Sequence, residues 1–176
     1  LALALAIRHP GRVRRLVLMG SVGVRFPLTE GLDQTWGYTP SLDNMRKLLD
    51  LFAYDRSRVT DELARLRYEA SIRPGFQESF AAMFPPPRQN GVDDLASSEE
   101  EIRALPHEAL IIHGREDRII PLQVSQTLAQ WLTKSQLHVF GQCGHWTQIE
   151  HAERFARLVE DFLTEADNLQ PQDTQP

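Results

Sequence analysis

Three short apolar segments, each with a glycine at or near its end, constrain the fold of this sequence most strongly. Residues 15–21 read RLVLMGS, residues 108–115 read EALIIHGR and residues 136–142 read QLHVFGQ. The continuous apolar run in residues 15–21 indicates a strand that is buried on both faces, and the other two segments also have the character of strands. Helical patterns separate the three runs, and strands separated by helices pair in parallel because each return needs a crossover. The sequence therefore predicts an α/β fold with the three strands consecutive in one parallel sheet, flanked by helices.

The first ten residues, LALALAIRHP, are expected to form a helix that is buried on all sides. Leu and Ala are strong helix formers, and although their alternation with period 2 would suit a strand, Ala is depleted in strands. No Ser, Thr, Asp or Asn precedes Leu1 as a helix cap, and the sequence does not begin with Met. We therefore expect the chain to be a fragment whose N-terminal part is missing.

A long segment with helical periodicity lies between the first two predicted strands. Apolar residues recur at helical spacing in residues 41–52, 59–72 and 75–83, whereas residues 27–40 contain Pro, Gly, Asp and Thr and are expected to be irregular. Such an insertion is expected to form a lid. The chain is thus predicted to divide into a core segment (1–24), a helical lid (25–104), a second core segment (105–166) and a disordered polar tail (167–176).

The composition argues against several classes of function. The 19 Lys and Arg side chains are outnumbered by 24 Asp and Glu, and a formal charge of −5 disfavours a nucleic-acid partner, because phosphate binding needs a concentrated basic face. The single cysteine cannot form an intramolecular disulfide and suits a reducing compartment such as the cytoplasm. The longest apolar run covers residues 1–7, far fewer than the roughly 20 residues that span a bilayer, so no membrane partner is expected.

An acid and a histidine follow two of the predicted strands. Asp117 lies in GREDRIIP and His145 lies in GQCGHW. In open parallel sheets, ligands bind at the carboxyl ends of the strands. Because one helix and one strand separate the two residues, their strands should be neighbours, about 4.8 Å apart. We therefore expect the Asp117 and His145 side chains to lie within hydrogen-bond distance, roughly 2.6–3.2 Å.

Each of these side chains also has a plainer interpretation when it is considered alone. Asp117 could be a solvated loop charge, and His145 an ordinary loop histidine. Cys143 and His145 could be metal ligands, but no second Cys-x-x-Cys or matching His spacing accompanies them, so no metal is expected. His151 is expected to be structural, and His113 to be a hydrogen-bonded core residue.

The sequence resembles the meta-cleavage product hydrolases of the α/β-hydrolase superfamily. The matching segments are collinear through nearly all of residues 1–165: LALALAIRHP, RLVLMGSVGV, FAYDR, LRYEASIRPGFQESF, ALIIHGREDRIIP and LHVFGQCGHWTQIEH. The superfamily carries its catalytic triad in the chain order nucleophile, acid, histidine. The resemblance implies the C-terminal part of an α/β-hydrolase fold that carries an inserted helical lid.

The resemblance also implies roles for five residues. Asp117 matches the triad acid and His145 the triad base. Arg67, in LRYEA of the lid, matches an arginine that binds the carboxylate–enol end of the substrate, although it would otherwise be interpreted as a surface charge. Trp146 and Ile119 match positions that line the substrate pocket.

The nucleophile motif G-x-S-x-G does not occur in the sequence. The resemblance implies that it lies just upstream of the first helix, before Leu1. Ser21 is not a substitute, because its flanking glycines are spaced differently and no helix follows it directly. The N–H donors of the oxyanion hole come from the residue after the nucleophile and from an early loop, so they would be missing too. This fragment alone is therefore expected to be inactive.

For the complete enzyme, the resemblance implies hydrolysis of a carbon–carbon bond in 2-hydroxy-6-oxo-2,4-dienoates, such as 2-hydroxymuconic semialdehyde. This reaction belongs to the meta-cleavage degradation of aromatic compounds and needs no cofactor. The expected partner is the small-molecule dienoate, and the sequence leaves open whether the enzyme is a homo-oligomer. Two alternatives also stay open: a generic lidded esterase, and a non-catalytic fragment that only associates with its missing half.

Overall fold

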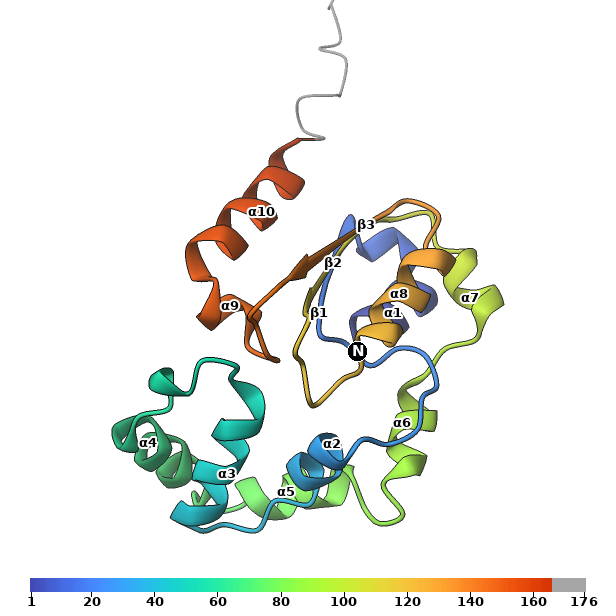
Figure 1. Ribbon diagram of the computed structural model, residues 1–176. Helices are drawn as coiled ribbons and strands as arrows, with labels where there is room; N and C mark the ends of the chain where they lie inside the picture. The colour runs from blue at the N-terminus through green and yellow to red at the C-terminus, as the bar shows by residue number, and fades with distance from the viewer. Residues whose placement is uncertain (166–176) are drawn as a thin grey trace, which may run out of the picture.

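The three predicted strands form one parallel sheet in the computed structural model, which describes residues 1–165 (Figure 1). They are β1 (Arg15–Met19), β2 (Glu108–Gly114) and β3 (Ser135–Phe140), paired in the order β1-β2-β3. The predicted parallel and consecutive arrangement is therefore confirmed. The tail that the sequence predicts to be disordered, 167–176, lies outside the described residues.

Helices cover both faces of the sheet. Figure 1 shows α1 (Ala2–Arg8) and α8 (Leu122–Trp131) on one side, and α10 (Ala152–Thr164) on the other. Successive side chains of a strand point to opposite faces, so the central strand β2 supplies both layers. Its Ile111 shares a core cluster with Leu128 of α8. The next residue, Ile112, shares another with Phe162 of α10.

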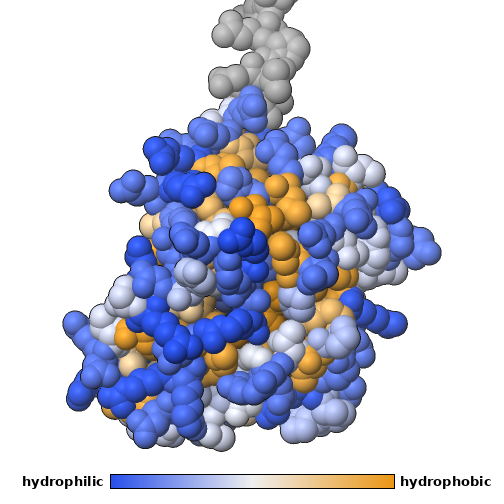
Figure 2. Space-filling model, in the orientation of Figure 1, coloured by the Kyte–Doolittle hydropathy of each residue, from blue (hydrophilic) through white to orange (hydrophobic). Residues whose placement is uncertain are grey.

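Helix α1 is buried on one face only, so the expectation of burial on all sides is wrong for the described residues. Leu3 and Ala6 pack into the same core as α8. Leu5, in contrast, is 50% exposed and Leu1 is fully exposed. Figure 2 shows apolar surface in the middle of the molecule, in the region where Figure 1 places the N-terminus and α1. The helix is apolar all round, but residues 1–165 supply a packing partner for one side of it.

The helical insertion, residues 25–104, connects β1 to β2. Its helices are α2 (Glu30–Trp36), α3 (Leu42–Phe52), α4 (Asp61–Ser71), α5 (Phe76–Met83), α6 (Gln89–Leu95) and α7 (Glu99–Arg103). In Figure 1, α2 to α5 lie beyond one end of the sheet, whereas α7 lies beside α8. Leu49 of α3 and Ala64 of α4 belong to a small core of their own. The three helices predicted for this region are therefore present.

Helix α2 corrects the expectation that residues 27–40 are irregular. The Thr29 hydroxyl caps it by accepting from the Leu32 N–H at 3.0 Å, and donates to the Ile119 carbonyl at 2.7 Å. At Gly31, an added Cβ would lie 2.2 Å from the Arg118 carbonyl oxygen. Contact with the loop after β2 thus stabilises a helix that is too short to show a clear periodicity.

Two other short helices, α6 and α9 (Thr147–Glu150), also lie where the sequence pattern predicts none. Both are too short to present a recognisable apolar stripe. The last helix, α10, ends at Thr164. None of the helices within residues 1–165 combines the length and the apolar character that crossing a membrane requires.

Candidate active site

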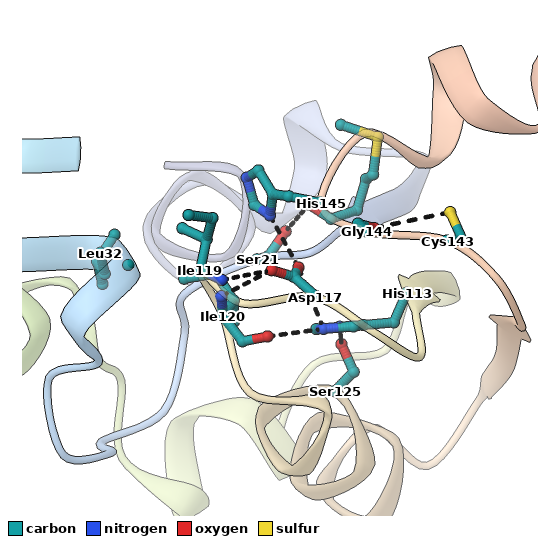
Figure 3. A network of polar contacts seen from close by, with 12 residues as sticks. Ser21, Leu32, His113, Asp117, Ile119, Ile120, Ser125, Cys143, Gly144 and His145 are labelled. Atoms are coloured by element: carbon teal, nitrogen blue, oxygen red, sulfur yellow. Dashed lines mark hydrogen bonds and ion pairs between the residues drawn. The ribbon is translucent and has the colours of Figure 1, made fainter. Parts of the chain in front are cut away.

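The carboxyl ends of β2 and β3 bring Asp117 and His145 together (Figure 3). His145 Nδ1 lies 2.8 Å from Asp117 Oδ2, so the predicted hydrogen-bond distance is confirmed. The Asp117 side chain is 1% exposed, whereas that of His145 is 22% exposed. An acid that is sealed from solvent and a histidine that reaches it are the arrangement in which a carboxylate orients an imidazole for proton transfer.

Four N–H groups surround the Asp117 carboxylate. Its Oδ1 accepts from the backbone N–H groups of Ile119 at 2.7 Å and Ile120 at 3.0 Å. Its Oδ2 accepts from His145 Nδ1 and lies 3.4 Å from His113 Nε2. A buried carboxylate is costly unless its lone pairs are used, and here both oxygens are satisfied. The loop after β2 therefore fixes the acid in a single orientation.

His113 is a fully buried, hydrogen-bonded core residue, as the sequence predicts. Its Nε2 lies 2.9 Å from the carbonyl oxygen of Ile120, which can only accept, so Nε2 carries the proton. Its Nδ1 then accepts from the Ser125 hydroxyl at 2.6 Å. Burial lowers the pKa of His113, and the charge of Asp117 opposes that shift only in part. His113 is thus a neutral donor beside the acid, a contact that the sequence pattern does not predict.

The lowered pKa of His113 gives a testable pH dependence of stability. Below about pH 6.5 the unfolded chain binds a proton on this imidazole and the folded chain does not, so the free energy of unfolding should decrease as the pH falls. Denaturant titrations between pH 7.5 and pH 5 measure this slope. Burial also lowers the pKa of His138, so a His113→Gln variant should keep a smaller slope. An unchanged slope in that variant would contradict the assignment.

The backbone comes close to its neighbours at two glycines near the Asp117–His145 pair. Gly20, at the end of β1, has φ +47, and a Cβ there would lie 3.1 Å from the His145 ring and 3.3 Å from Asp117 Oδ2. A Cβ on Gly144 would lie 2.4 Å from the carbonyl oxygen of Phe52. Each of these positions has too little room for a side chain, so glycine is required.

Two cavities lie beside the pair. The His145 cavity, about 430 Å³, is also lined by Ile119. The Arg67 cavity, about 400 Å³, lies within the helical insertion and has mostly apolar walls. The side chains that line both cavities are Thr35, Phe52 and Trp146. The two cavities are therefore neighbours with a shared wall.

Stacked rings form that shared wall. The Phe52 ring centroid lies 5.2 Å from that of Trp146 and 5.6 Å from that of His145. On the far side, the Arg67 guanidinium carbon lies 5.7 Å from the Trp146 ring centroid. A planar ligand that bridges the cavities would meet His145 at one end and Arg67 at the other.

The alternative that Cys143 and His145 bind a metal finds no support in the geometry. Within residues 1–165, no group of three or more His, Cys, Asp or Glu side chains could hold a metal ion. Burial and the neighbouring Glu150 raise the pKa of the Cys143 thiol to about 12.

Residues 1–152 match the protein family described as "alpha/beta hydrolase fold". The chain belongs to this family. This membership confirms the predicted fold class, a parallel sheet with flanking helices, and the resemblance seen in the sequence.

This α/β-hydrolase chain is similar to enzymes of meta-cleavage pathways. It is 82% identical over 169 residues to a 2-hydroxymuconate semialdehyde hydrolase of Pseudomonas putida, covering 96% of this chain and 60% of that protein. It is 66% identical to a 2-hydroxy-6-oxo-2,4-heptadienoate hydrolase of Pseudomonas putida strain F1, covering 95% of this chain and 60% of that protein. The chain thus spans about 60% of the length of the curated relatives that it matches.

This chain is also similar to a solved structure of a meta-cleavage product hydrolase. The meta-cleavage product hydrolase CumD from Pseudomonas fluorescens IP01 superposes with a TM-score of 0.92 and 65% sequence identity. The match covers 94% of this chain and 61% of that one. The resemblance to meta-cleavage product hydrolases is therefore confirmed in sequence and in structure.

Three of the five sequence-predicted site residues line one cavity, a fourth contacts one of them from behind, and the fifth lines the neighbouring cavity. Asp117 supports His145, which lines the His145 cavity with Ile119 and Trp146. Arg67 lines the neighbouring cavity. The catalytic and binding roles of the five residues stay predictions.

Three further parts of the site could not be recognised from the sequence. These are the His113–Ser125 pair behind the acid, Phe52 in the shared wall, and Glu150 behind the histidine loop. Phe52 and Glu150 lie within the quoted family segments or next to them, but their residue types alone do not suggest a role. From the sequence alone, Glu150 in particular would be interpreted as an exposed surface acid.

Proposed function

We propose that the protein containing this chain hydrolyses a carbon–carbon bond of 2-hydroxy-6-oxo-2,4-dienoates, with 2-hydroxymuconic semialdehyde as its substrate. The observation that carries this proposal is the buried Asp117–His145 pair, which is separated by one aromatic wall from a cavity that contains Arg67. The name of the 82% identical relative supports the choice of substrate.

In this proposal His145 moves the protons. Its Nδ1–H donates to Asp117, which leaves Nε2 as the acceptor that can take a proton from a nucleophile or a water. The imidazolium that forms is stabilised by the carboxylate. The sequence contains no G-x-S-x-G motif. We therefore expect the nucleophile to be supplied by the part of the relatives that this chain does not cover.

The substrate must be ketonised before the bond breaks. The proton of the 2-hydroxyl group moves to C5, which gives the keto tautomer, so that C5 can leave as a carbanion stabilised as a dienolate when C6 is attacked. Water then supplies OH to C6, which leaves as a carboxylic acid, and the remaining proton of that water goes to the C2 oxygen of the dienolate. These steps need a proton carrier and no cofactor, and His145 fits that requirement.

Arg67 is the proposed partner of the substrate carboxylate. Among the described residues that line its cavity, it alone is charged. A carboxylate that enters this mostly apolar cavity would lose water and gain charge-assisted hydrogen bonds to the guanidinium. The planar dienoate would then extend past Trp146 toward His145.

The direct test uses a fusion of this 176-residue chain with the part of the Pseudomonas putida relative that precedes the matched region. With 2-hydroxymuconic semialdehyde, the fusion is expected to bleach the dienolate absorbance and release a carboxylic acid. Simple aryl esters should be poor substrates. Ester hydrolysis without dienoate turnover would instead support the lidded-esterase alternative. No activity on either class would support a chain that only associates with its missing half.

Replacement of Arg67 by Ala in the fusion should lower kcat/KM for the dienoate by about 30- to 1000-fold, or about 2–4 kcal/mol. Arg65 is the matched control. It lies two residues away on α4, about 200° around the helix axis, and does not line the cavity. Arg65→Ala should therefore change little. Steady-state kinetics of both variants decide the point, and equal losses would remove Arg67 from the proposed site.

We also propose a cytoplasmic location, supported by the single free cysteine, Cys143, which is buried and reduced. Cell fractionation with an antibody against the protein tests this proposal.

A further inference from the structure

Glu150 is a buried carboxylate that receives hydrogen bonds from two separate segments. It ends helix α9 and is 8% exposed. Its Oε1 accepts from the backbone N–H of Gly144 at 2.7 Å. Its Oε2 accepts from the backbone N–H groups of Tyr54 at 2.8 Å and Asp55 at 3.0 Å. Each oxygen therefore serves one segment.

The two segments belong to opposite sides of the candidate site. Gly144 directly precedes His145, whereas Tyr54 and Asp55 follow helix α3 of the helical insertion. The same two segments also meet directly, because the backbone N–H of His145 donates to the Phe52 carbonyl at 2.8 Å. Glu150 thus reinforces the one place where the histidine loop touches the end of α3.

The charge of Glu150 is balanced by N–H dipoles. Within residues 1–165, none of the ion pairs formed by Lys, Arg or His includes Glu150, and the Cys143 thiol lies 3.9 Å from its Oε1. Hydrogen bonds from backbone N–H groups to a charged acceptor are stronger than neutral ones. The backbone N–H groups of the two segments therefore hold the Glu150 carboxylate in place of a salt-bridge partner.

The position of these segments sets the geometry of the shared wall. Phe52, two residues before Tyr54, stacks on both Trp146 and His145. If the end of α3 moved away from the histidine loop, Phe52 would move relative to the imidazole, and both cavities would change shape. Displacements of about 1 Å in a reacting group can cost about 10²-fold in rate.

We propose that Glu150 is a positioning residue that holds the helical insertion and the His145 loop in one fixed relation, so that the imidazole and the wall of the substrate cavities are set together. The effect on turnover rests on the proposed function. The coupling of the two segments does not, because it is a property of the backbone hydrogen bonds.

Two substitutions separate this role from a general contribution to folding. In Glu150→Gln, one oxygen becomes an NH₂ group, which cannot accept, so one of the two segments must lose its hydrogen bonds. In Glu150→Asp, the charge stays but the shorter side chain cannot reach both segments. Glu153→Gln is the matched control, since Glu153 lies three residues away on α10 and is exposed.

Amide hydrogen exchange of the fusion, followed by NMR or mass spectrometry, measures the coupling between the two segments independently of turnover. Exchange at Gly144, or at Tyr54 and Asp55, should accelerate at least tenfold in both Glu150 variants, with strand β2 still protected. In Glu153→Gln it should not change. Unchanged exchange at both segments would overturn the proposal. Acceleration that extends equally to β2 would also overturn it, because it would indicate that the whole fold is destabilised.

Steady-state kinetics of the same variants measure the effect of the substitutions on kcat and KM. We expect kcat for the dienoate to fall by about 10- to 100-fold in both variants, with a smaller change in KM, because Arg67 lies on α4 and takes part in none of the hydrogen bonds that Glu150 accepts. Accelerated exchange together with an unchanged kcat would overturn the positioning role. If the fusion itself turned over no dienoate, the proposed function would fail while the exchange result still decided the coupling.

Discussion

Purified on its own, the 176-residue chain is expected to turn over 2-hydroxymuconic semialdehyde at least about 10⁶-fold more slowly than the fusion. Removing the nucleophile of a triad enzyme costs on this order, because the remaining acid and base have nothing to activate. The chain contains Asp117 and His145 but no G-x-S-x-G motif.

Stopped-flow absorbance measurements on matched concentrations of the chain and the fusion give this ratio. A fusion with His145→Ala is the control for residual turnover by the nucleophile-bearing part alone, and it should be nearly as slow as the isolated chain. A chain that turned over the dienoate within about tenfold of the fusion would show that its reaction uses some other nucleophile.

Asp117→Asn should lower kcat of the fusion by about 10⁴-fold, the loss typical of this change in a serine-protease triad. The structure gives the reason. Two backbone N–H groups donate to Oδ1, so the amide oxygen of an asparagine must take that place. Its NH₂ group then faces Nδ1 of His145 and donates to it, so Nδ1 must accept and carry no proton. The imidazole would carry its proton on Nε2 and could not act as a base there.

Asp161, exposed on α10, provides the matched control. Asp161→Asn should leave kcat unchanged, and both variants should bind a substrate analogue with similar affinity. NMR of the ring nitrogens would report the tautomer of His145 directly. A tautomer that is unchanged in Asp117→Asn, or a loss of kcat below tenfold, would be incompatible with the assigned role of the acid.

The sheet and the acid–histidine pair could be predicted because their signals are local. Each strand is a continuous apolar run, and parallel strands separated by one helix are neighbours, so the residues just after them must meet. The distance between Asp117 and His145 follows from that rule. The short helix α2 could not be predicted in the same way. It depends on Thr29 bonding to the loop after β2, a contact that joins positions far apart in the sequence.

The contacts of the supporting residues could not be predicted, because they depend on burial. The sequence predicts that His113 is a hydrogen-bonded core residue, but not that it lies beside the acid, and nothing in the pattern indicates which N–H groups surround the Glu150 carboxylate. Arg67 was predicted from the resemblance alone. Its separation from His145 by the Phe52–Trp146 wall emerges only from the packing of α3 against the histidine loop.

The uncovered face of α1 bears on how this polypeptide behaves in solution. Leu1 and Leu5 present apolar surface, and β1, next to α1, has a partner on one side only among the described strands. A bare strand edge beside exposed leucines is a template for pairing with another molecule. The apparent molar mass of the isolated chain, measured by light scattering, should therefore rise with concentration. A polypeptide that covers this face should be co-produced in the same cell, so that the strand edge is occupied as the chain folds.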